Sequence, residues 1–403
     1  MSEHGDQVPG YRMIRMEALP DAPAAALADV EAWQARKAYP NVLGGGGPVF
    51  GVAEELETGG WRIISSCSTS FPQGARDTMA MLFRGWARDA LDAGDTESQQ
   101  EWLRGAERLD WETVDELTVH GRRFRVVRGD QFIRMGPTGP EPPRPSDPDP
   151  AKVGHGNEYR GRTKGFVIDP YTPTGMSEGI LRMELLSLVQ ARGTAPAAVR
   201  KDSLRALKTH PGGVLLPAEF TAAEFSDGHW APTQMTNPSP QGSRDTLTSY
   251  LRVMAPVMEQ LDEETRAEYG RLADRIDAER CDEIVIDGCR TRIVRVERLV
   301  RVGPDGPEGP RPSDPDPELP TAVQTQQLRE EGVFDEDRVL SEEEAEQQRI
   351  AEEQAKEFLR LFEEQRKRRE AASGPPEGGG RESVDGGVAL LEADADLVHE
   401  RVR

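Results

Sequence analysis

The clearest pattern of apolar and polar positions in the chain follows Pro72. Apolar side chains recur after it at nearly helical spacing, at Met79, Leu82, Phe83, Trp86 and Leu91. Proline suits the first position of a helix, because its fixed φ is helical and its missing N-H has no partner there. A similar series follows Pro240 and comprises Leu247, Tyr250, Leu251, Met254 and Val257. The pattern therefore predicts a long helix after each proline.

Weaker patterns predict the neighbouring elements. Residues 24–38 are rich in alanine and predict a helix, and residues 49–66 predict a β-hairpin around Gly59 and Gly60. A second helix is expected over residues 97–109, with a counterpart over residues 264–276. Each of these helices precedes a β-rich run. In the later run Asp287 and Gly288 form the Asp-Gly pair that favours a tight hairpin turn.

Long segments of the chain occur twice. Residues 121–150 and 288–317 share roughly nineteen of thirty positions, including the ending Pro-Arg-Pro-Ser-Asp-Pro-Asp-Pro. The motif Pro-Gln-Gly-x-Arg-Asp-Thr likewise occurs at residues 72–78 and 240–246. The sequence therefore predicts a tandem duplication with a period of about 167 residues.

Strands that are joined by hairpins and separated by helices favour an α+β fold, with helices packed on antiparallel hairpin-rich sheets. We expect two such units, at residues 11–150 and 177–317, joined by a connector at residues 151–176 that is basic around residues 159–164. The Gly/Pro-rich straps at residues 136–150 and 303–317 cannot be sheet interior, because proline cannot donate to a β-ladder, and we expect them to terminate each unit. Duplicated units often pack with pseudo-twofold symmetry.

The last fifth of the chain differs in composition. We expect a linker at residues 318–340, a charged helix at residues 341–371 and a disordered acidic tail at residues 372–403. The helix has a thin apolar stripe, made of Ala351, Ala355, Phe358 and Phe362. This stripe is too short for an independent coiled coil. Phe358 and Phe362 are therefore candidate contacts with a partner surface, and a solvated charged helix is the alternative.

The paired Gly-Pro-x-Gly-Pro-Glu-x-Pro-Arg-Pro-Ser-Asp-Pro-Asp-Pro segments resemble an actinobacterial, streptomycete-type family of unknown function, sometimes named PE-PGRS-like. The resemblance spans residues 13–317. It implies a lineage and carries no catalytic residue, cofactor or ligand to this chain.

Composition and charge narrow the function classes. The net charge of -22 repels nucleic acid and anionic lipid, so neither is an expected partner. No apolar run is long enough to span a membrane, and no leader of the secretory type opens the sequence. Cys67, Cys281 and Cys289 form no disulfide pattern, so we expect reduced thiols and a cytoplasmic protein.

The repeated Pro-Gln-Gly-x-Arg-Asp-Thr motif is the main candidate site. A helix start offers free backbone N-H groups, and the motif adds an amide and a guanidinium, which together suit an anion. The candidate anion or ligand site consists of Gln73, Arg76, Asp77, Gln241, Arg244 and Asp245. The alternative is local and structural: the proline begins the helix, Ser239 caps the second copy, and each arginine pairs with a nearby carboxylate.

Arginines of the predicted terminal hairpins also recur, as Arg123, Arg125, Arg128 and Arg134 and as Arg290, Arg292, Arg295 and Arg301. Their mixed parity prevents a single basic stripe on one sheet face. We expect them to pair with the aspartates of the Ser-Asp-Pro-Asp-Pro segments or with neighbouring strands.

Other motifs predict no chemistry. The Gly-x-Ser-x-Gly at residues 175–179 lacks the preceding strand of a nucleophile elbow, and we expect a connector loop. Gly44 to Gly47 lacks the spacing of a phosphate-binding loop, and a plain loop is expected. His120 is expected in a turn. The scattered histidines and cysteines predict no metal site, and no cofactor is expected.

These features favour a non-enzymatic interaction or adaptor protein, which would bind a protein partner through its C-terminal helix or its proline straps. The alternative is a ligand or anion sensor, or an enzyme, with its site at the two repeated helix starts. The pattern does not determine an oligomeric state.

Overall fold

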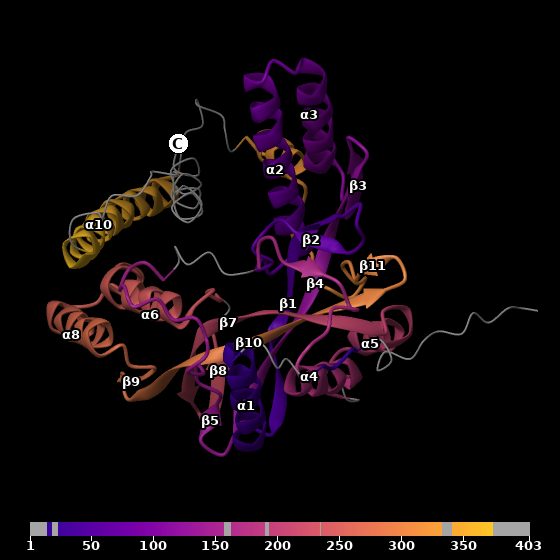
Figure 1. Ribbon diagram of the computed structural model, residues 1–403. Helices are drawn as coiled ribbons and strands as arrows, with labels where there is room; N and C mark the ends of the chain where they lie inside the picture. Colours follow the sequence, from indigo (N-terminus) through magenta and orange to yellow (C-terminus); the bar gives the residue numbers. More distant parts are fainter. Residues whose placement is uncertain are drawn as a thin grey trace, which may run out of the picture. The chain divides into compact units, whose positions relative to one another are not determined.

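The computed structural model describes residues 14–17, 23–156, 163–189, 193–233, 235–332 and 341–373. Figure 1 shows a mixed arrangement of helices and antiparallel strands, which confirms the predicted α+β class. The α-helices are α1 Pro23–Ala38, α2 Pro72–Asp92, α3 Thr96–Trp111, α4 Met176–Ser187, α5 Ala197–Thr209, α6 Pro240–Ser249, α7 Ala255–Met258, α8 Glu263–Glu279, α9 Thr321–Glu330 and α10 Glu342–Ser373. A π-helix, η2, spans Tyr250–Met254. The strands are β1 Asn41–Glu55, β2 Trp61–Ile63, β3 Glu116–Val119, β4 Arg122–Gly136, β5 Gly139–Pro140, β6 Val167–Ile168, β7 Gly212–Ser226, β8 His229–Pro232, β9 Glu283–Ile286, β10 Cys289–Gly303 and β11 Gly306–Pro307.

The chain divides into two compact units, each assembled from segments far apart in the sequence. Unit 1 comprises Met1–Ser146, Gly161–Glu219 and Arg295–Gln326. Unit 2 comprises Asp147–Arg160, Phe220–Val294 and Gln327–Arg403. The predicted boundaries, with sequential domains at residues 11–150 and 177–317, divide the chain differently and remain a prediction.

The sheet of unit 1 is built on the antiparallel pair β1–β4. Strand β2 pairs with the outer edge of β1, and β10 pairs with β4 from Glu297 opposite Phe132 to Val300 opposite Gly129. The register of β1 shifts between Gly44 and Pro48. The expectation of a plain loop at Gly44 to Gly47 is therefore wrong: this run lies inside a strand, at an irregularity where residues without side chains tolerate the distorted ladder.

Helices α2 and α3 pack side by side in unit 1 (Figure 1). Helix α2 begins at Pro72, as predicted, and α3 is capped by Asp95, whose side chain accepts a hydrogen bond from the Ser98 N-H at 3.0 Å. Their inner faces contribute Phe83 and Trp102 to a buried apolar cluster that also contains Phe124 of β4. Burial of these rings is what fixes the helix pair against the sheet.

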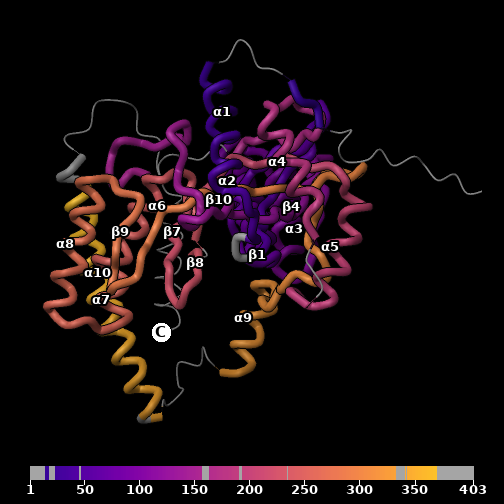
Figure 2. Tube along the Cα trace, turned by 90° about the horizontal axis from the view of Figure 1, so that it is seen from below, coloured from indigo at the N-terminus to yellow at the C-terminus, as the bar shows by residue number. Residues whose placement is uncertain are grey.

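Unit 2 has its own helical layer and apolar cluster. The helix predicted after Pro240 is interrupted by η2 and then continues as α7. Ser239 caps α6, as expected, by accepting a hydrogen bond from the Gly242 N-H at 3.0 Å. The cluster contains Leu251, Ala255, Tyr269, Ala273, Ile276 and Ile284. Helix α10 lies alongside α7 (Figure 2) and also contacts η2.

The hairpins and straps follow the prediction. Strand β3 pairs with β4, and β9 with β10, through the expected tight turns; His120 and Asp287 occupy those turns at φ of 53° and 48°. Two short strands form at the start of the straps, where β5 pairs with the end of β4 and β11 with the end of β10. Each of these strands is only two residues long, so the proline lies at its end and no longer ladder is broken.

Two further expectations change. The residues 175–179 do not form a connector loop, because Met176 begins α4 and Ser177 lies in its first turn, where its N-H donates to Asp29 Oδ1 at 2.8 Å. Helix α9 was not predicted, since its sequence is polar and lacks an apolar stripe. The predicted charged helix is confirmed as α10. The expected tail from residue 374 onward and most of the basic stretch at residues 159–164 lie outside the described residues.

Candidate functional site

The repeated motif forms a buried ion-paired cluster at the start of α2 in unit 1. The Gln73 N-H donates to Asp316 Oδ1 at 3.0 Å, and Arg76 Nη1 donates to Asp316 Oδ2 at 2.7 Å. Arg76 Nε also donates to Asp115 Oδ1 at 2.8 Å. The arginine side chain is only 2% exposed, so two carboxylates neutralise one buried guanidinium.

The second copy of the motif makes the same contacts at the start of α6 in unit 2. The Gln241 N-H donates to Asp149 Oδ1 at 2.9 Å, and Arg244 Nη2 donates to the same carboxylate at 2.6 Å. Arg244 Nη1 donates to Asp282 Oδ1 at 2.5 Å. Burial raises the pKa of Asp282 despite this arginine.

In both units the carboxylate comes from a strap and occupies the position where an external anion would bind. It accepts from a free N-H of the first helical turn and from the motif arginine, the two donor types that suit an anion at a helix start. We call the two clusters latch 1 (Gln73, Arg76, Asp115 and Asp316) and latch 2 (Gln241, Arg244, Asp149 and Asp282). The predicted site residues thus come together around aspartates of the chain itself.

The aspartate of each motif, Asp77 or Asp245, accepts hydrogen bonds from the glutamine side chain of its own motif and from the chain that follows a strap. Asp77 Oδ1 accepts from Gln73 Nε2 at 2.8 Å and from Thr321 Oγ1 at 3.2 Å, and burial raises its pKa. Asp245 accepts from Gln241 Nε2 and from the N-H groups of Gly154 and Gly156, at 2.8 to 2.9 Å. These aspartates hold the chain that follows a strap against the helix.

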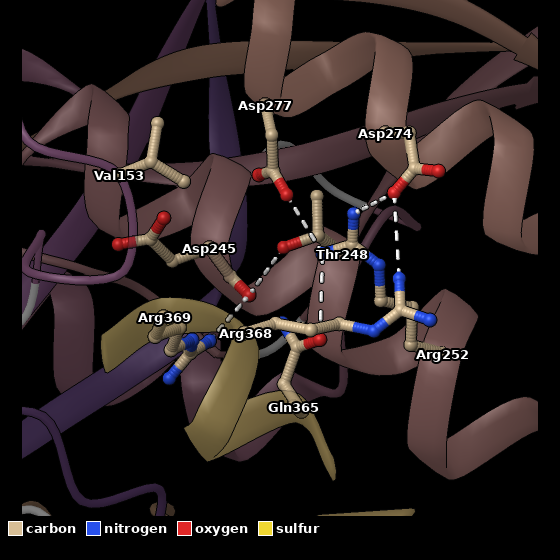
Figure 3. Close-up of a pocket in the computed structure, with 9 residues that line it drawn as sticks. All are labelled: Val153, Asp245, Thr248, Arg252, Asp274, Asp277, Gln365, Arg368 and Arg369. Atoms are coloured by element: carbon tan, nitrogen blue, oxygen red, sulfur yellow. Dashed lines mark hydrogen bonds and ion pairs between the residues drawn. The ribbon is translucent and has the colours of Figure 1, made fainter. Parts of the chain in front are cut away.

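Unit 2 contains a cavity of about 180 Å³ behind Asp245 (Figure 3). It is lined by Val153, Asp245, Thr248, Arg252, Asp274, Asp277, Gln365, Arg368 and Arg369. Arg252, which lies in η2, donates from Nη1 to Asp277 Oδ2 and from Nη2 to Asp274 Oδ1, both at 2.7 Å. Helix α10 contributes the last three lining residues, so it closes one side of the cavity.

Two buried polar atoms of the cavity have no hydrogen-bond partner among the described residues: Arg252 Nε and Asp277 Oδ1. One is a donor and the other an acceptor. Burial raises the pKa of Asp277, although Arg252 opposes this shift. A water molecule or a small polar group with both hydrogen-bonding functions could satisfy the two atoms.

Of the residues that line the cavity, sequence reasoning identified only Asp245. One sequence signal for the cavity was present. At the repeat spacing, Arg84 corresponds to Arg252 and Asp110 to Asp277. In the structure both pairs form an ion pair. Two polar positions that recur together on different helices indicate a shared contact.

The hairpin arginines are paired, as expected. Arg128 Nε donates to Asp314 Oδ2 at 2.9 Å, which is the predicted contact with a Ser-Asp-Pro-Asp-Pro segment. Arg123 and Arg125 together lower the pKa of Asp305 to about 2. The other hairpin arginines also form ion pairs: Arg134 with Glu184, Arg290 and Arg292 with Glu283, Arg295 with Glu297, and Arg301 with Asp130.

The apolar stripe of α10 contains a stacked aromatic pair. The ring centroids of Phe358 and Phe362 are 6.0 Å apart, and both side chains are half-buried. Polar contacts fix the same part of the helix to unit 2: Glu357 pairs with Arg266 at 3.0 Å, and Arg369 Nη2 donates to Ser249 Oγ at 2.7 Å. The role of the two phenylalanines in binding a partner stays a prediction.

The cysteines are free thiols. Cys67 is buried at a φ of 54°, and a Cβ added to Gly51 would lie 2.6 Å from the Cys67 Cα, so the two backbones touch. Burial raises the pKa of Cys67 to about 11, which keeps it protonated at neutral pH. Among the described residues, no group of His, Cys, Asp and Glu could hold a metal ion, and no helix is long and apolar enough to cross a membrane.

The chain is thus an α+β protein with two similar latches. In each latch a strap aspartate accepts hydrogen bonds from the first turn of a helix and from the motif arginine. Residues 22–317 match a family described as a family of unknown function (DUF5954), and the chain belongs to that family. No curated protein and no solved structure matches the chain. The expected membership of a family of unknown function is confirmed; its actinobacterial range and PE-PGRS-like naming stay predictions.

Proposed function

We propose that the chain is a non-enzymatic interaction or adaptor protein. The observation that carries this proposal is the burial of Arg76 and Arg244, each between two carboxylates of the chain. An external anion could reach either guanidinium only by displacing a strap aspartate that is already hydrogen-bonded to the helix start. Such a pair is costly to break, because it would leave a buried charge uncompensated.

The C-terminal helix is the surface we propose for a protein partner. Apolar side chains remain open on α10, with Ile350 42% and Leu359 53% exposed. The straps are weaker candidates, because their aspartates Asp149 and Asp316 are used inside the latches. The acidic balance of the chain makes nucleic acid and anionic membranes poor partners.

We also propose that residues 11–150 and 177–317 descend from a duplication. The repeated sequence supports this, and so do the matching contacts of latch 1 and latch 2, in which each motif arginine meets one strap aspartate and one aspartate before a hairpin. We propose a cytoplasmic location on the basis of the free thiols and acidic composition.

A second candidate is a small-ligand sensor or an enzyme. It is favoured by the cavity beside Asp245, where Arg252 Nε and Asp277 Oδ1 are buried without partners. In this alternative the ligand would bind in the cavity beside Asp245 and not at the motif arginine Arg244.

Native mass spectrometry of the full chain, purified from its own lysate by mild methods, tests the two candidates. An adaptor should show the mass of the chain alone or with bound protein. A constant small adduct that is lost in Asp277→Asn and kept in the exposed control Glu318→Gln would overturn the adaptor proposal in favour of a sensor.

A further inference from the structure

Helix α10 covers one face of the helical layer in unit 2. Arg252 Nη1 donates to Gln365 Oε1 at 3.4 Å, Arg369 Nη2 donates to Ser249 Oγ at 2.7 Å, and Arg368 approaches Asp274 to 3.7 Å. Under this cover the Arg252 side chain is only 10% exposed.

Within the described part of the chain, the corresponding face of unit 1 has no such cover. By the register of the repeated motif, Arg84 of α2 stands where Arg252 stands, and Asp110 of α3 stands where Asp277 stands. The ion pair is present in both units. The Arg84 side chain, however, is 47% exposed.

Apolar side chains on the same face are also open to solvent. On α2, Met81, Arg84 and Leu91 fall within one helical stripe, and Met81 is 62% and Leu91 50% exposed. On α3, Leu103 is 43% exposed and shares a stripe with Glu107 and Asp110. We call this surface the open face: Met81, Arg84, Leu91, Leu103, Glu107 and Asp110.

We propose that the open face binds an amphipathic helix of a partner protein that, like α10, ends in arginines. The expected chemistry of the partner helix follows from unit 2, where Arg368 of α10 lies against Asp274. Glu107 is the counterpart of Asp274 on the open face, so it offers an arginine of the partner the same kind of contact. Met81 replaces Ser249, so the partner should present an apolar side chain where α10 presents Arg369. The α10 of the chain itself is engaged in unit 2 by the contacts described above.

This inference rests on the proposed interaction function and names its partner class. The probe is a fluorescent peptide of residues 342–373 that carries Arg369→Leu, so that an apolar side chain lies opposite Met81; it is titrated into the full chain and followed by anisotropy. We expect saturable one-to-one binding that weakens at least tenfold in Met81→Asp and in Glu107→Lys, because the lysine would repel the arginines of the peptide. Both positions are exposed, so both variants should fold. Glu97→Lys, at an exposed α3 position outside the open face, makes the same charge change as Glu107→Lys and should leave binding unaltered.

Absence of peptide binding to the wild-type chain would overturn the inference. So would binding that survives Met81→Asp and Glu107→Lys but is lost in Asp274→Lys, because the peptide would then be displacing α10 in unit 2. A protein partner that the full chain retains in the Met81→Asp variant would contradict the open face while leaving the adaptor function standing.

Discussion

Arg76 and Asp316 are 240 residues apart in the chain, yet Arg76 Nη1 lies 2.7 Å from Asp316 Oδ2. The carboxylate also accepts from the Gln73 N-H, so one strap residue satisfies both a buried charge and a helix start. Latch 2 repeats this arrangement with Arg244 and Asp149, 95 residues apart.

Removal of the charge at Asp316 should destabilise the protein. Asp316→Asn leaves Arg76 with Asp115 as its only carboxylate, and we expect a loss of about 2 kcal/mol in the free energy of unfolding. Asp149→Asn should cost a similar amount in latch 2. Urea denaturation followed by circular dichroism measures both. Glu318→Gln, which removes an exposed charge two residues after Asp316, is the control; an equal loss in this variant would argue against the latch.

Neither half of the chain should fold fully alone. A fragment of residues 1–160 lacks Asp316 and also the part of β10 that pairs with β4. We expect it to show no cooperative thermal transition, and co-expression with residues 161–403 to restore one. A protease site placed after residue 160 and cut only after folding should leave the transition in place. A cooperative melt of the isolated fragment would contradict this prediction.

The pH dependence of stability should change in Asp277→Asn. Burial raises the pKa of Asp277 above its ordinary value of 3.8. The unfolded chain therefore loses this proton at lower pH than the folded chain, and the contribution of the group to stability declines as pH rises through the folded pKa. The asparagine variant lacks this decline. Compared with wild type, it should gain stability between about pH 4 and neutral pH, as measured by urea midpoints in matched buffers. A constant difference across that range would show that the pKa is not raised.

Gly156 should not tolerate a side chain. A Cβ there would lie 2.1 Å from the Gly242 N, which belongs to the first turn of α6. The three nearest atoms all belong to the backbone of Gln241 and Gly242, which cannot move easily, and we expect Gly156→Ala to cost about 3 kcal/mol. Gly85→Ala is the matched control. A Cβ at Gly85 meets nothing within 4 Å, and the substitution in a helix interior should raise stability by about 0.5 to 1 kcal/mol. Thermal melts that give the two variants the same sign would contradict this account.

Local features were predictable from the sequence where a single segment contains the whole signal. The helices after Pro72 and Pro240 follow from apolar spacing and from the position of proline. The turn at Asp287 follows from the Asp-Gly pair, and the grouping of Gln73 with Arg76 and Asp77 follows from helical spacing. In each case the interacting residues are within a few positions of each other.

The remaining features depend on tertiary structure. No local pattern shows that Asp316 meets Arg76, since strap residues could fold back onto any helix start. The run of glycines from Gly44 to Gly47 predicts a loop from the sequence, and only its pairing with β4 in the folded chain identifies it as part of a strand. The cavity was missed because Arg252 and Asp277 are ordinary charged residues in the sequence, and only the folded chain brings α10 against Arg252.

Unit 1 is assembled from segments far apart in the sequence, and this has a consequence for protein synthesis. Its closing segment, residues 295–326, is made long after Arg76 has left the ribosome. At about 5 to 20 residues per second, the 240 residues between Arg76 and Asp316 take about 12 to 48 s to translate. During that interval Arg76 has Asp115 but lacks its second partner carboxylate, and β4 has an open edge where β10 will pair. An open strand edge invites pairing with another nascent chain. Slowed translation should therefore raise the aggregated fraction of newly made protein, even when the finished chain is stable.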